Sequence, residues 1–407
     1  MESQRANSFE VGQRLTVSIE KVAHGGHFIA RHDGQVIFVR HAIPGERVEI
    51  EVTSTSSNFY RADVVEVLEP SLDRVVAPCS FSHAGGCGGC DFQHINSARQ
   101  RALKADVIVE QFSRIAKRPI EVVVEEIGDS LHWRTRISSA TDDRGQIGFY
   151  ASRSHTVIPV KDCLIATSGV DYPELAARRW PIKSRVEISV SSSAERSIAI
   201  APATRGSKPR HTQGPSILKE NIYGHELQVS HTSFWQSHEL APEVLTALVR
   251  EQVQEGDYVL DLYGGVGLFT AAVLDLIGES GHVDLVESSS SATADARRNF
   301  EAMPHVKIHV GDVEKGLDKI FRADVVILDP PREGSGKEVL AKVVALSPRS
   351  VIYVACDPAA LARDCQYFEA LGWEMATLRA FDLFPMTHHV ECVAVFHPFQ
   401  KGSNKVS

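Results

Sequence analysis

The chain lacks the long hydrophobic runs that mark proteins of membranes or of the secretory pathway. No stretch of eighteen consecutive apolar residues occurs among its 407 residues, so a membrane span is not expected. The first residues carry no apolar signal core, and the chain is therefore expected in the cytoplasm. In that reducing compartment, the seven cysteines are not expected to form structural disulfides.

An excess of positive charge, a common mark of nucleic-acid binding, is also missing. The formal net charge of −9 at pH 7 argues weakly against nucleic acid as a partner. The average hides a basic stretch between residues 178 and 219, in which only Glu187 and Glu195 are acidic. Its cations are Arg178, Arg179, Lys183, Arg185, Arg196, Arg205, Lys208, Arg210 and Lys219. This stretch is expected either to hold phosphates or to form an ordinary solvated surface.

The length of the chain predicts two or three domains, and the first of them is all-β. Within residues 8–70, apolar and polar residues alternate at 15–20, 36–39 and 48–52, and glycine-containing turns separate these segments. Five short strands in about sixty residues suit a small OB-like barrel, a fold that often binds nucleic acid.

The remaining residues divide into a second β-rich region and an α/β region. Residues 71–232 are expected to form a central domain that begins with a cysteine-rich loop at 78–94. A helix is expected at 96–116, packed on the domain that follows. Strands are expected at 146–150, 156–160 and 186–190. Residues 233–400 alternate strands and helices, as a parallel sheet requires.

A glycine-rich turn in the α/β region has the features of a cofactor site. The turn at 261–267, Asp-Leu-Tyr-Gly-Gly-Val-Gly, follows a strand and opens an apolar helix, where backbone amides can meet a ligand. Glu287 ends the next strand and can accept hydrogen bonds from ribose hydroxyls, and Asp312 follows the third strand, on the adenine side. The third glycine of the dinucleotide fingerprint is absent, so S-adenosylmethionine fits better than NAD. The alternative is a Rossmann-like turn that holds no ligand.

Two apolar strands further along, at 325–328 and 350–354, end in proline-containing turns. Asp329 begins the first turn and Cys356 lies in the second, at the carboxyl ends of strands where α/β sheets place their chemistry. Together with Glu391 downstream, they suggest nucleophilic catalysis with a separate base. The alternative is that Cys356 is a small buried apolar residue, as most free cysteines are.

Four other cysteines suggest an inorganic centre. Cys79, Cys87 and Cys90 lie within twelve residues of one another in a glycine-rich loop, and Cys163 lies far downstream. Four thiolates can hold either zinc or a [4Fe–4S] cluster, and the spacing favours neither. A disulfide or chance clustering is the alternative.

In these motifs, the chain resembles the S-adenosylmethionine-dependent RNA uridine-5-methyltransferases, in the branch with a TRAM domain and an iron–sulfur cluster. The resemblance covers nearly the whole chain: residues 11–69 look like the TRAM barrel and residues 233–400 like a Rossmann-like class I methyltransferase. It implies a [4Fe–4S] cluster rather than zinc, and the cluster ligands it implies are Cys79, Cys87, Cys90 and Cys163. The central domain would bind RNA.

The resemblance also implies roles for single residues. The segment 234–236, Phe-Trp-Gln, matches the family's Phe-x-Gln motif. The implied cofactor-binding residues are Gln236, Tyr263, Glu287, Asp312 and Asp329. Cys356 matches the catalytic nucleophile, and Glu391 matches the base.

The implied reaction is methylation of carbon 5 of a specific uridine in RNA, in 23S ribosomal RNA rather than in transfer RNA, which is the alternative. The Cys356 thiolate adds to carbon 6, carbon 5 takes the methyl group, Glu391 removes the carbon-5 proton, and Cys356 leaves. The uridine must be flipped or single-stranded. Phe234 or Trp235 is expected either to face the base or to pack in the core. A monomer is expected.

The chain departs from the family at several positions. Asp357 stands where an asparagine usually follows the nucleophile, and a carboxylate near Cys356 would oppose thiolate formation. The other departures are Gly264 for Cys, Leu268 and His238 for Asn, and His388 for Gly. These departures leave open an altered RNA target or reduced activity. Leu268 and Asp357 favour a second hypothesis, a non-catalytic RNA-binding protein on a methyltransferase scaffold. A third hypothesis, a redox sensor built on the cluster, depends on the four cysteines alone.

Overall fold

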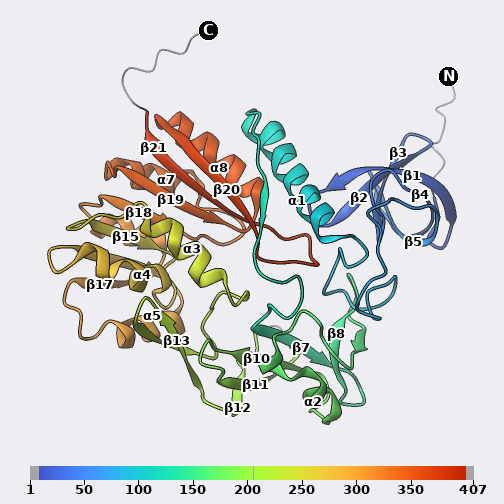
Figure 1. The fold of residues 1–407 in the computed structure, drawn as a ribbon, viewed down its shortest axis with the longest axis horizontal. Coiled ribbons are helices and arrows are strands. Elements are labelled where there is room, and N and C mark those ends of the chain that lie inside the picture. Colours follow the sequence, from blue (N-terminus) through green and yellow to red (C-terminus); the bar gives the residue numbers. More distant parts are fainter. Residues whose placement is uncertain (1–8, 205, 400–407) are drawn as a thin grey trace, which may run out of the picture.

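The computed structural model describes residues 9–204 and 206–399 (Figure 1). The outermost residues of the predicted domains, 8 and 400, therefore lie outside the described residues. The same holds for the N-terminal segment from which the cytoplasmic location is expected and for Arg205 of the basic stretch.

The first domain is a closed barrel of five strands in the order β1-β2-β3-β5-β4. The strands are β1 (Arg14–Ala23), β2 (His27–His32), β3 (Gln35–Arg40), β4 (Arg47–Thr55) and β5 (Tyr60–Glu69). The period-two pattern explains the barrel: in β4, Val48, Ile50 and Val52 point inward and are buried, while the residues between them are more exposed. The predicted OB-like barrel is confirmed.

The central part is built on a six-stranded sheet in the order β12-β11-β10-β7-β8-β9. Its strands are β7 (Arg136–Thr141), β8 (Ile147–Tyr150), β9 (Val157–Pro159), β10 (Ser184–Val190), β11 (Arg196–Pro202) and β12 (Arg210–Gln213). A short helix α2 (Tyr172–Ala177), preceded by a 3-10 turn η2 (Ser168–Val170), covers one face. The strands expected near 146–150, 156–160 and 186–190 correspond to β8, β9 and β10.

The third part is a mixed sheet of eight strands in the order β17-β16-β15-β18-β19-β21-β20-β6. Its strands are β6 (Val124–Glu126), β15 (Tyr258–Leu262), β16 (His282–Glu287), β17 (Val306–Val310), β18 (Val325–Leu328), β19 (Ser350–Ala355), β20 (Trp373–Asp382) and β21 (Glu391–Pro398). Strands β15 to β19 run parallel, and β21 is antiparallel to both of its neighbours. All residues of β18 and β19 are buried, as expected for parallel strands covered on both faces.

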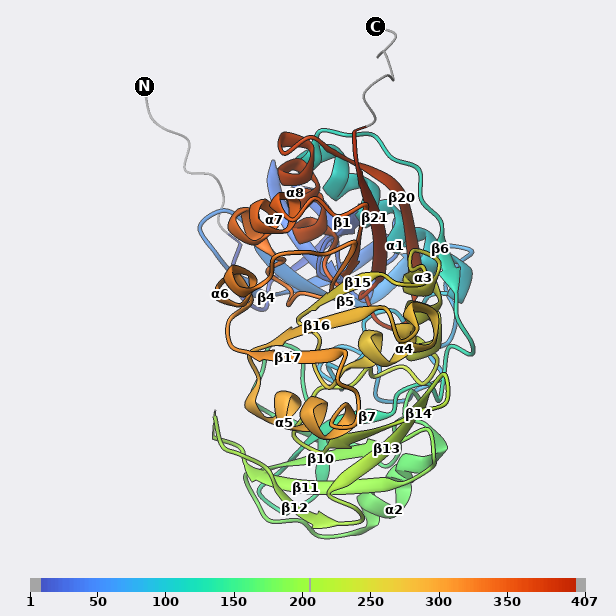
Figure 2. The ribbon, with the colours of Figure 1, turned by 90° about the vertical axis from the view of Figure 1, so that its left-hand side faces the viewer.

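Helices cover this sheet on both faces, which confirms the Rossmann-like architecture (Figure 2). One face packs against α3 (Ala241–Arg250), α4 (Leu268–Ile277) and α5 (Ser290–Asn299). The other packs against α6 (Val313–Gly316), the 3-10 turn η3 (Leu317–Lys319), α7 (Gly336–Ala345) and α8 (Pro358–Ala370). The sheet therefore has a buried core on each side.

Segments from the first half of the chain complete this third part. Helix α1 (Ser97–Gln111), capped by the Asn96 side chain, continues into a π-helical turn η1 (Phe112–Ala116). Its buried Ile108 and Phe112 share a core with α8, and β6 pairs with β20. The hairpin β13 (Ile217–Ile222) and β14 (His225–Ser230) packs against α5 on the other face. The helix expected at 96–116 thus lies against the α/β sheet.

No helix within residues 9–204 and 206–399 combines the length and the apolar character needed to cross a membrane.

Candidate active site and cysteine cavity

The structure brings Asp329, Cys356 and Glu391 to one edge of the sheet. Asp329 directly follows β18 and Cys356 directly follows β19, so both lie at the carboxyl ends of parallel strands. Glu391 is the first residue of β21, which runs antiparallel to β19 and pairs Cys392 with Ala355. The beginning of β21 therefore meets the end of β19, and the carboxyl and the thiol become neighbours.

The thiol of Cys356 is partly exposed and surrounded by charge. Burial raises its pKa to about 11, and the negative charges of Glu391 and Asp329 raise it as well. Arg332 opposes them and favours the thiolate, while Asp357 adds a weaker unfavourable effect. A ligand that covers the carboxylates or brings positive charge would therefore favour ionisation of the thiol.

Glu391 and Asp329 are both shifted toward their protonated forms. Burial raises the pKa of Glu391 well above its usual value, and the negative charge of Asp329 adds to that shift. Burial also raises the pKa of Asp329 to about 7, with Asp261 as the second cause. Asp329, with a pKa of about 7, can exchange protons near neutral pH, and the raised pKa of Glu391 makes its carboxylate a stronger base than an ordinary glutamate.

The predicted cofactor turn lies between β15 and α4 and is held in a constrained conformation. Tyr263 adopts a positive φ of 61°, and a Cβ atom on Gly264 would lie 2.6 Å from Cγ of Leu285. Gly264, which stands for a cysteine in the family, is therefore the residue that fits this turn beside Leu285. Gly267 (φ 99°) opens α4, and its Cβ would overlap the ring of Phe300. The glycines thus let the backbone pass close to its neighbours.

Two carboxylates flank this turn at the ends of the next strands. Glu287 ends β16, and its Oε2 accepts a hydrogen bond from the Gly265 amide at 3.1 Å. Asp312 lies just after β17, is exposed, and caps α6 through the amide of Lys315. Both predicted cofactor residues thus lie at the same sheet edge as Tyr263.

Gln236 reaches this edge from the segment before α3. Its Nε2 donates to Oδ2 of Asp329 at 3.4 Å. The segment is fixed by backbone hydrogen bonds from Thr135 to Ser237 and from Glu239 to Trp133. All five predicted cofactor residues therefore come from segments that meet at the carboxyl ends of β15, β16, β17 and β18.

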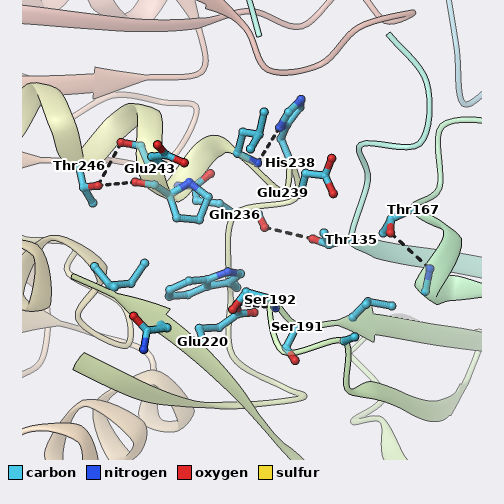
Figure 3. A pocket seen from close by; sticks show the side chains of 18 of the residues that line it. Thr135, Thr167, Ser191, Ser192, Glu220, Gln236, His238, Glu239, Glu243 and Thr246 are labelled. Atoms are coloured by element: carbon cyan, nitrogen blue, oxygen red, sulfur yellow. Dashed lines mark hydrogen bonds between the residues drawn. The ribbon is translucent and has the colours of Figure 1, made fainter. Parts of the chain in front are cut away.

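The same segment forms one wall of a cavity of about 650 Å³ (Figure 3). Gln236 and Glu239 line it together with Thr135 and Ser191 of the central part and Glu220 of β13. Burial raises the pKa of Glu220, and burial together with Asp129 raises that of Glu239. No sequence signal indicated this cavity, because its walls come from five separate stretches of the chain.

Two departures from the family pattern prove to be packing residues. Leu268 is the first residue of α4 and is buried in the core. His238 is buried, stacks on Trp133 with ring centroids 5.4 Å apart, and accepts a hydrogen bond from the Leu240 amide at Nδ1. Burial lowers the pKa of His238 to about 4, so the ring is neutral near pH 7. Trp235 is buried too, whereas Phe234 is exposed.

The four cysteines of the predicted metal centre line a second, smaller cavity of about 220 Å³. Cys79, Cys87 and Cys90 come from the loop before α1, and Cys163 comes from the segment after β9. Within residues 9–204 and 206–399, no group of three or more His, Cys, Asp or Glu side chains is arranged to hold a metal ion. The structure thus places the four thiols around one space but leaves the predicted cluster untested.

The sequence did not indicate that the barrel would touch the catalytic edge. A third cavity of about 220 Å³ contains Cys356 and Arg332 on one side and His24 of the β1–β2 turn on the other. Nδ1 of His388, which replaces a glycine of the family, lies 2.6 Å from Oδ2 of Asp91. The pair of glycines at 25 and 26 predicted a turn. It did not predict that this turn would contact the α/β sheet.

Three protein-family models match the sequence. They are the TRAM domain over residues 8–65, tRNA (Uracil-5-)-methyltransferase over residues 301–397, and Protein-L-isoaspartate(D-aspartate) O-methyltransferase over residues 207–328. The second match contains Asp329, Cys356 and Glu391.

Whole-length relatives decide the family. A protein of Streptomyces avermitilis named as an uncharacterized RNA methyltransferase is 41% identical, over 96% of this chain and 100% of its own length. One of Bifidobacterium longum with the same description is 34% identical, over 97% of this chain and 99% of its own. The chain belongs to the TRAM-domain RNA methyltransferases. The resemblance predicted from the motifs is thereby confirmed for the family, while its iron–sulfur part stays a prediction.

A solved structure shares the whole fold of this RNA methyltransferase. It is the Pyrococcus abyssi tRNA (uracil-54, C5)-methyltransferase in complex with S-adenosyl-L-homocysteine, with a TM-score of 0.72 and 20% identity. The similarity covers 93% of this chain and 99% of that one. At this identity, the likeness establishes the shared architecture of barrel, central sheet and methyltransferase domain.

Proposed function

We propose that this RNA methyltransferase transfers a methyl group from S-adenosylmethionine to carbon 5 of a specific uridine, through a covalent bond between Cys356 and carbon 6. The observation that carries the proposal is the junction of β19 and β21, which makes Cys356 and Glu391 neighbours beside Asp329. A thiol next to a carboxyl with a raised pKa is the pair that this chemistry needs.

The thiol must act first, because carbon 5 of uracil is a poor nucleophile. The Cys356 thiolate adds to carbon 6 and the ring becomes an enolate. Arg332 favours this thiolate against the carboxylates around it. Carbon 5 would then attack the methyl group of S-adenosylmethionine, the bond between methyl carbon and sulfur would break, and S-adenosylhomocysteine would leave with the electron pair.

Glu391 completes the reaction. Its carboxylate takes the proton from carbon 5, the double bond between carbons 5 and 6 re-forms, and Cys356 leaves as a thiolate. The buried position of Glu391, at 4% exposure, makes it a strong base once it is ionised, because burial disfavours the charged form. Asp329, whose pKa is also raised, provides a neighbouring charge that strengthens this effect.

The five residues at the strand ends fit an adenosine-containing methyl donor. Glu287, the last residue of β16, would bind the ribose, and Asp312, just after β17, would bind the adenine. Tyr263 lies in the turn after β15, and Gln236 contacts Asp329, which lies near the thiol. In this arrangement the domains keep the predicted roles: residues 8–70 and 71–232 bind RNA, and residues 233–400 carry out the methyl transfer.

The RNA proposed as substrate is 23S ribosomal RNA, because the combination of TRAM domain and cysteine loop resembles the enzymes that act on it. Transfer RNA is the second candidate, and one observation favours it: the solved structure that shares the whole fold is named a tRNA (uracil-54, C5)-methyltransferase. Mapping 5-methyluridine in both RNA classes from a deletion strain, with and without the gene restored, decides between them.

We also propose that the cysteine cavity holds a [4Fe–4S] cluster, with Cys79, Cys87, Cys90 and Cys163 as ligands. What supports this proposal is that all four cysteines line one cavity, together with the half-buried Arg134, whose charge would offset that of a thiolate-ligated cluster. Since methyl transfer needs no electrons, the cluster would shape the RNA-binding surface rather than act as a redox sensor.

The proposal is tested with RNA that contains 5-fluorouridine, whose carbon 5 carries no proton for Glu391 to remove. The wild type should form a stable covalent adduct after methyl transfer. Cys356→Ala should form no adduct and should not methylate normal RNA. Glu391→Gln should bind normal RNA covalently and release it slowly. Cys365→Ala, which changes a buried cysteine of α8, is the matched control and should keep activity.

Full activity of Cys356→Ala would contradict the mechanism. Calorimetry with S-adenosylmethionine separates the remaining hypothesis of a non-catalytic RNA-binding protein, since such a protein would bind RNA but not the methyl donor.

A further inference from the structure

The turn between β1 and β2 brings the barrel against the catalytic edge of the sheet. His24, Gly25 and Gly26 line the same cavity as Cys356 and Asp357. Both glycines have positive φ angles, of 91° and 79°. A Cβ on Gly26 would lie 2.8 Å from Cγ of His388, so only glycine allows this close approach.

His24 contacts the residue that follows the nucleophile. Its Nε2 lies 3.1 Å from Oδ2 of Asp357. The other oxygen of Asp357, Oδ1, accepts hydrogen bonds from the amides of Ala359 and Ala360 at 2.9 and 3.0 Å, and so caps α8. One oxygen is thus held by the helix and the other by the barrel.

Both partners are shifted toward their charged forms. The hydrogen bond to Asp357 is the largest effect on His24 and raises the pKa of the imidazole. Burial works against the charge of Asp357, but the hydrogen bond from His24 and the two helix amides hold the pKa of this carboxyl below its usual range. An ion pair therefore forms at mildly acidic pH, where the raised pKa keeps His24 protonated and Asp357 is ionised.

We propose that His24 is a positioning residue that acts through Asp357 on the ionisation of Cys356. The negative charge of Asp357 opposes the Cys356 thiolate, and a protonated His24 at 3.1 Å offsets that charge. The barrel thereby supports the nucleophile, and the aspartate that replaces the family's asparagine is tolerated. The inference relies on the proposed function only in taking Cys356 as the nucleophile.

Other charged groups around this site remain the same when His24 changes. His24 also faces Arg114 of η1, whose charge lowers the pKa of the imidazole. Lys104, Arg332, His388 and His389 line the cavity. A separate contact holds the barrel in place, because Asp91 joins Arg40 of β3 at 3.4 Å to His388 at 2.6 Å. Loss of His24 therefore leaves the barrel attached.

The test is the rate at which iodoacetamide alkylates Cys356, followed by mass spectrometry of its peptide over a range of pH. At about pH 6, where His24 carries its charge, His24→Ala and His24→Gln should react roughly threefold more slowly than the wild type. That factor is the half-unit shift in thiol pKa expected from one charge several ångströms away at a partly exposed site. At about pH 9 the three curves should converge, because His24 is then neutral in the wild type as well.

Asp357→Asn provides the decisive comparison. In the Asp357→Asn protein, adding His24→Ala should leave the alkylation rate unchanged at every pH. The carboxylate charge that His24 offsets is then absent. A His24→Ala effect that persists at high pH or survives in Asp357→Asn would overturn the inference, as would no effect at all. If the wild type shows this alkylation pattern but methylates no RNA, the proposed function fails and the inference stands.

Discussion

Gln236 donates a hydrogen bond from Nε2 to Oδ2 of Asp329 across 3.4 Å, and it thereby ties the segment before α3 to the turn after β18. Asp329 follows β18, the strand beside β15, whose end carries the turn with Tyr263. Because Asp329 also borders Cys356, this contact links the proposed methyl-donor site to the proposed nucleophile.

Replacement of Gln236 should weaken methyl-donor binding. Gln236→Ala removes one hydrogen-bond donor, which is worth about 1 kcal/mol, or roughly a fivefold increase in Kd for S-adenosylmethionine. Gln236→Glu should be worse, since a second carboxylate would face Asp329. Calorimetry measures the Kd of both variants. As a control, Gln254→Ala changes an exposed glutamine in the loop before β15 and should leave the Kd unchanged. Equal Kd values for all three variants would show that Gln236 does not bind S-adenosylmethionine.

Loss of one cavity cysteine should abolish the cluster. Wild-type protein purified without oxygen should be brown, absorb near 400 nm (roughly where thiolate-ligated clusters absorb) and contain iron and sulfide. Cys90→Ser should lose the colour and the iron, whereas Cys365→Ser, a buried cysteine outside the cavity, should keep both. Colourless wild-type protein that contains zinc would contradict the [4Fe–4S] prediction.

The basic stretch divides into paired and exposed cations. Among the described residues, Arg178, Arg185, Arg196 and Lys219 form ion pairs with glutamates. Arg179, Lys183, Lys208 and Arg210 are exposed. The exposed group is the one available to RNA phosphates, while the paired group matches the solvated-surface alternative.

Charge reversal in the exposed group should weaken RNA binding. Lys183→Glu with Arg210→Glu should reduce the slope of log K against log salt by at least about 1.4, because each lost phosphate contact is worth about 0.7 on single-stranded RNA. The charge-matched control, Lys319→Glu with Arg322→Glu, changes exposed cations beside the opposite end of the sheet. An equal loss of slope in both variants would show only an effect of net charge.

Asp261 should make the protein less stable as pH rises. Burial raises the pKa of this carboxyl from 3.8 to about 7, although the amide and hydroxyl of Thr270 partly oppose the shift. A folded-state pKa above the unfolded one gives a contribution that is complete below about pH 4 and is lost as pH rises through about 7. Asp261→Asn keeps an oxygen for Thr270 but cannot ionise.

The stability difference between Asp261→Asn and the wild type should therefore grow from about pH 4 to about pH 8, to a few kcal/mol at most. Urea unfolding without ligand measures it. Asp275→Asn should show the opposite sign, because its hydrogen bond to Arg250 holds the pKa of Asp275 below its usual range. A pH-independent difference for Asp261→Asn would mean that this carboxyl has the same pKa in the folded and the unfolded protein.

The residues at the strand ends could be predicted from the sequence, whereas the contacts between domains could not. Asp329 and Cys356 could be assigned because an apolar run followed by proline predicts a strand end, and parallel strands end at one edge. The proximity of Glu391 depends on β21 being antiparallel, which no local pattern indicates. Cys163 could be counted as a fourth thiol, but no local pattern indicated that it lies beside the cysteine loop, since their cavity forms by tertiary packing.

The burial of polar residues between helices and strands was the hardest feature to predict from the sequence. Lys104 lies in a helix with a weak apolar pattern, and lysines are rarely buried, so a solvent-exposed side chain would be expected. The structure buries it completely between α1 and β20. His24 is similar: its glycine neighbours indicate a turn, but the contact with Asp357 arises only when the barrel docks.

Removal of Lys104 should strongly destabilise the protein. Nζ of Lys104 lies 2.5 Å from Oδ1 of Asp382 and donates to the carbonyl of Phe384 at 3.0 Å, with 0% and 5% exposure of the two charged side chains. Lys104→Met leaves the Asp382 charge buried without a partner, which costs about 3–5 kcal/mol. Lys104→Met combined with Asp382→Leu should recover most of that loss, because a buried ion pair is often worth no more than an apolar pair.

Urea unfolding of the single and double variants gives this coupling energy directly. The matched control is the pair of Lys21 and Glu110, which lie 2.7 Å apart and also join α1 to another element, but in the solvent. Lys21→Met should cost less than about 1 kcal/mol, since solvent screens an exposed pair. If Lys104→Met cost as little as Lys21→Met, the attachment of α1 to the sheet would depend on the apolar contacts of Ile108 and Phe112 instead of on the buried ion pair.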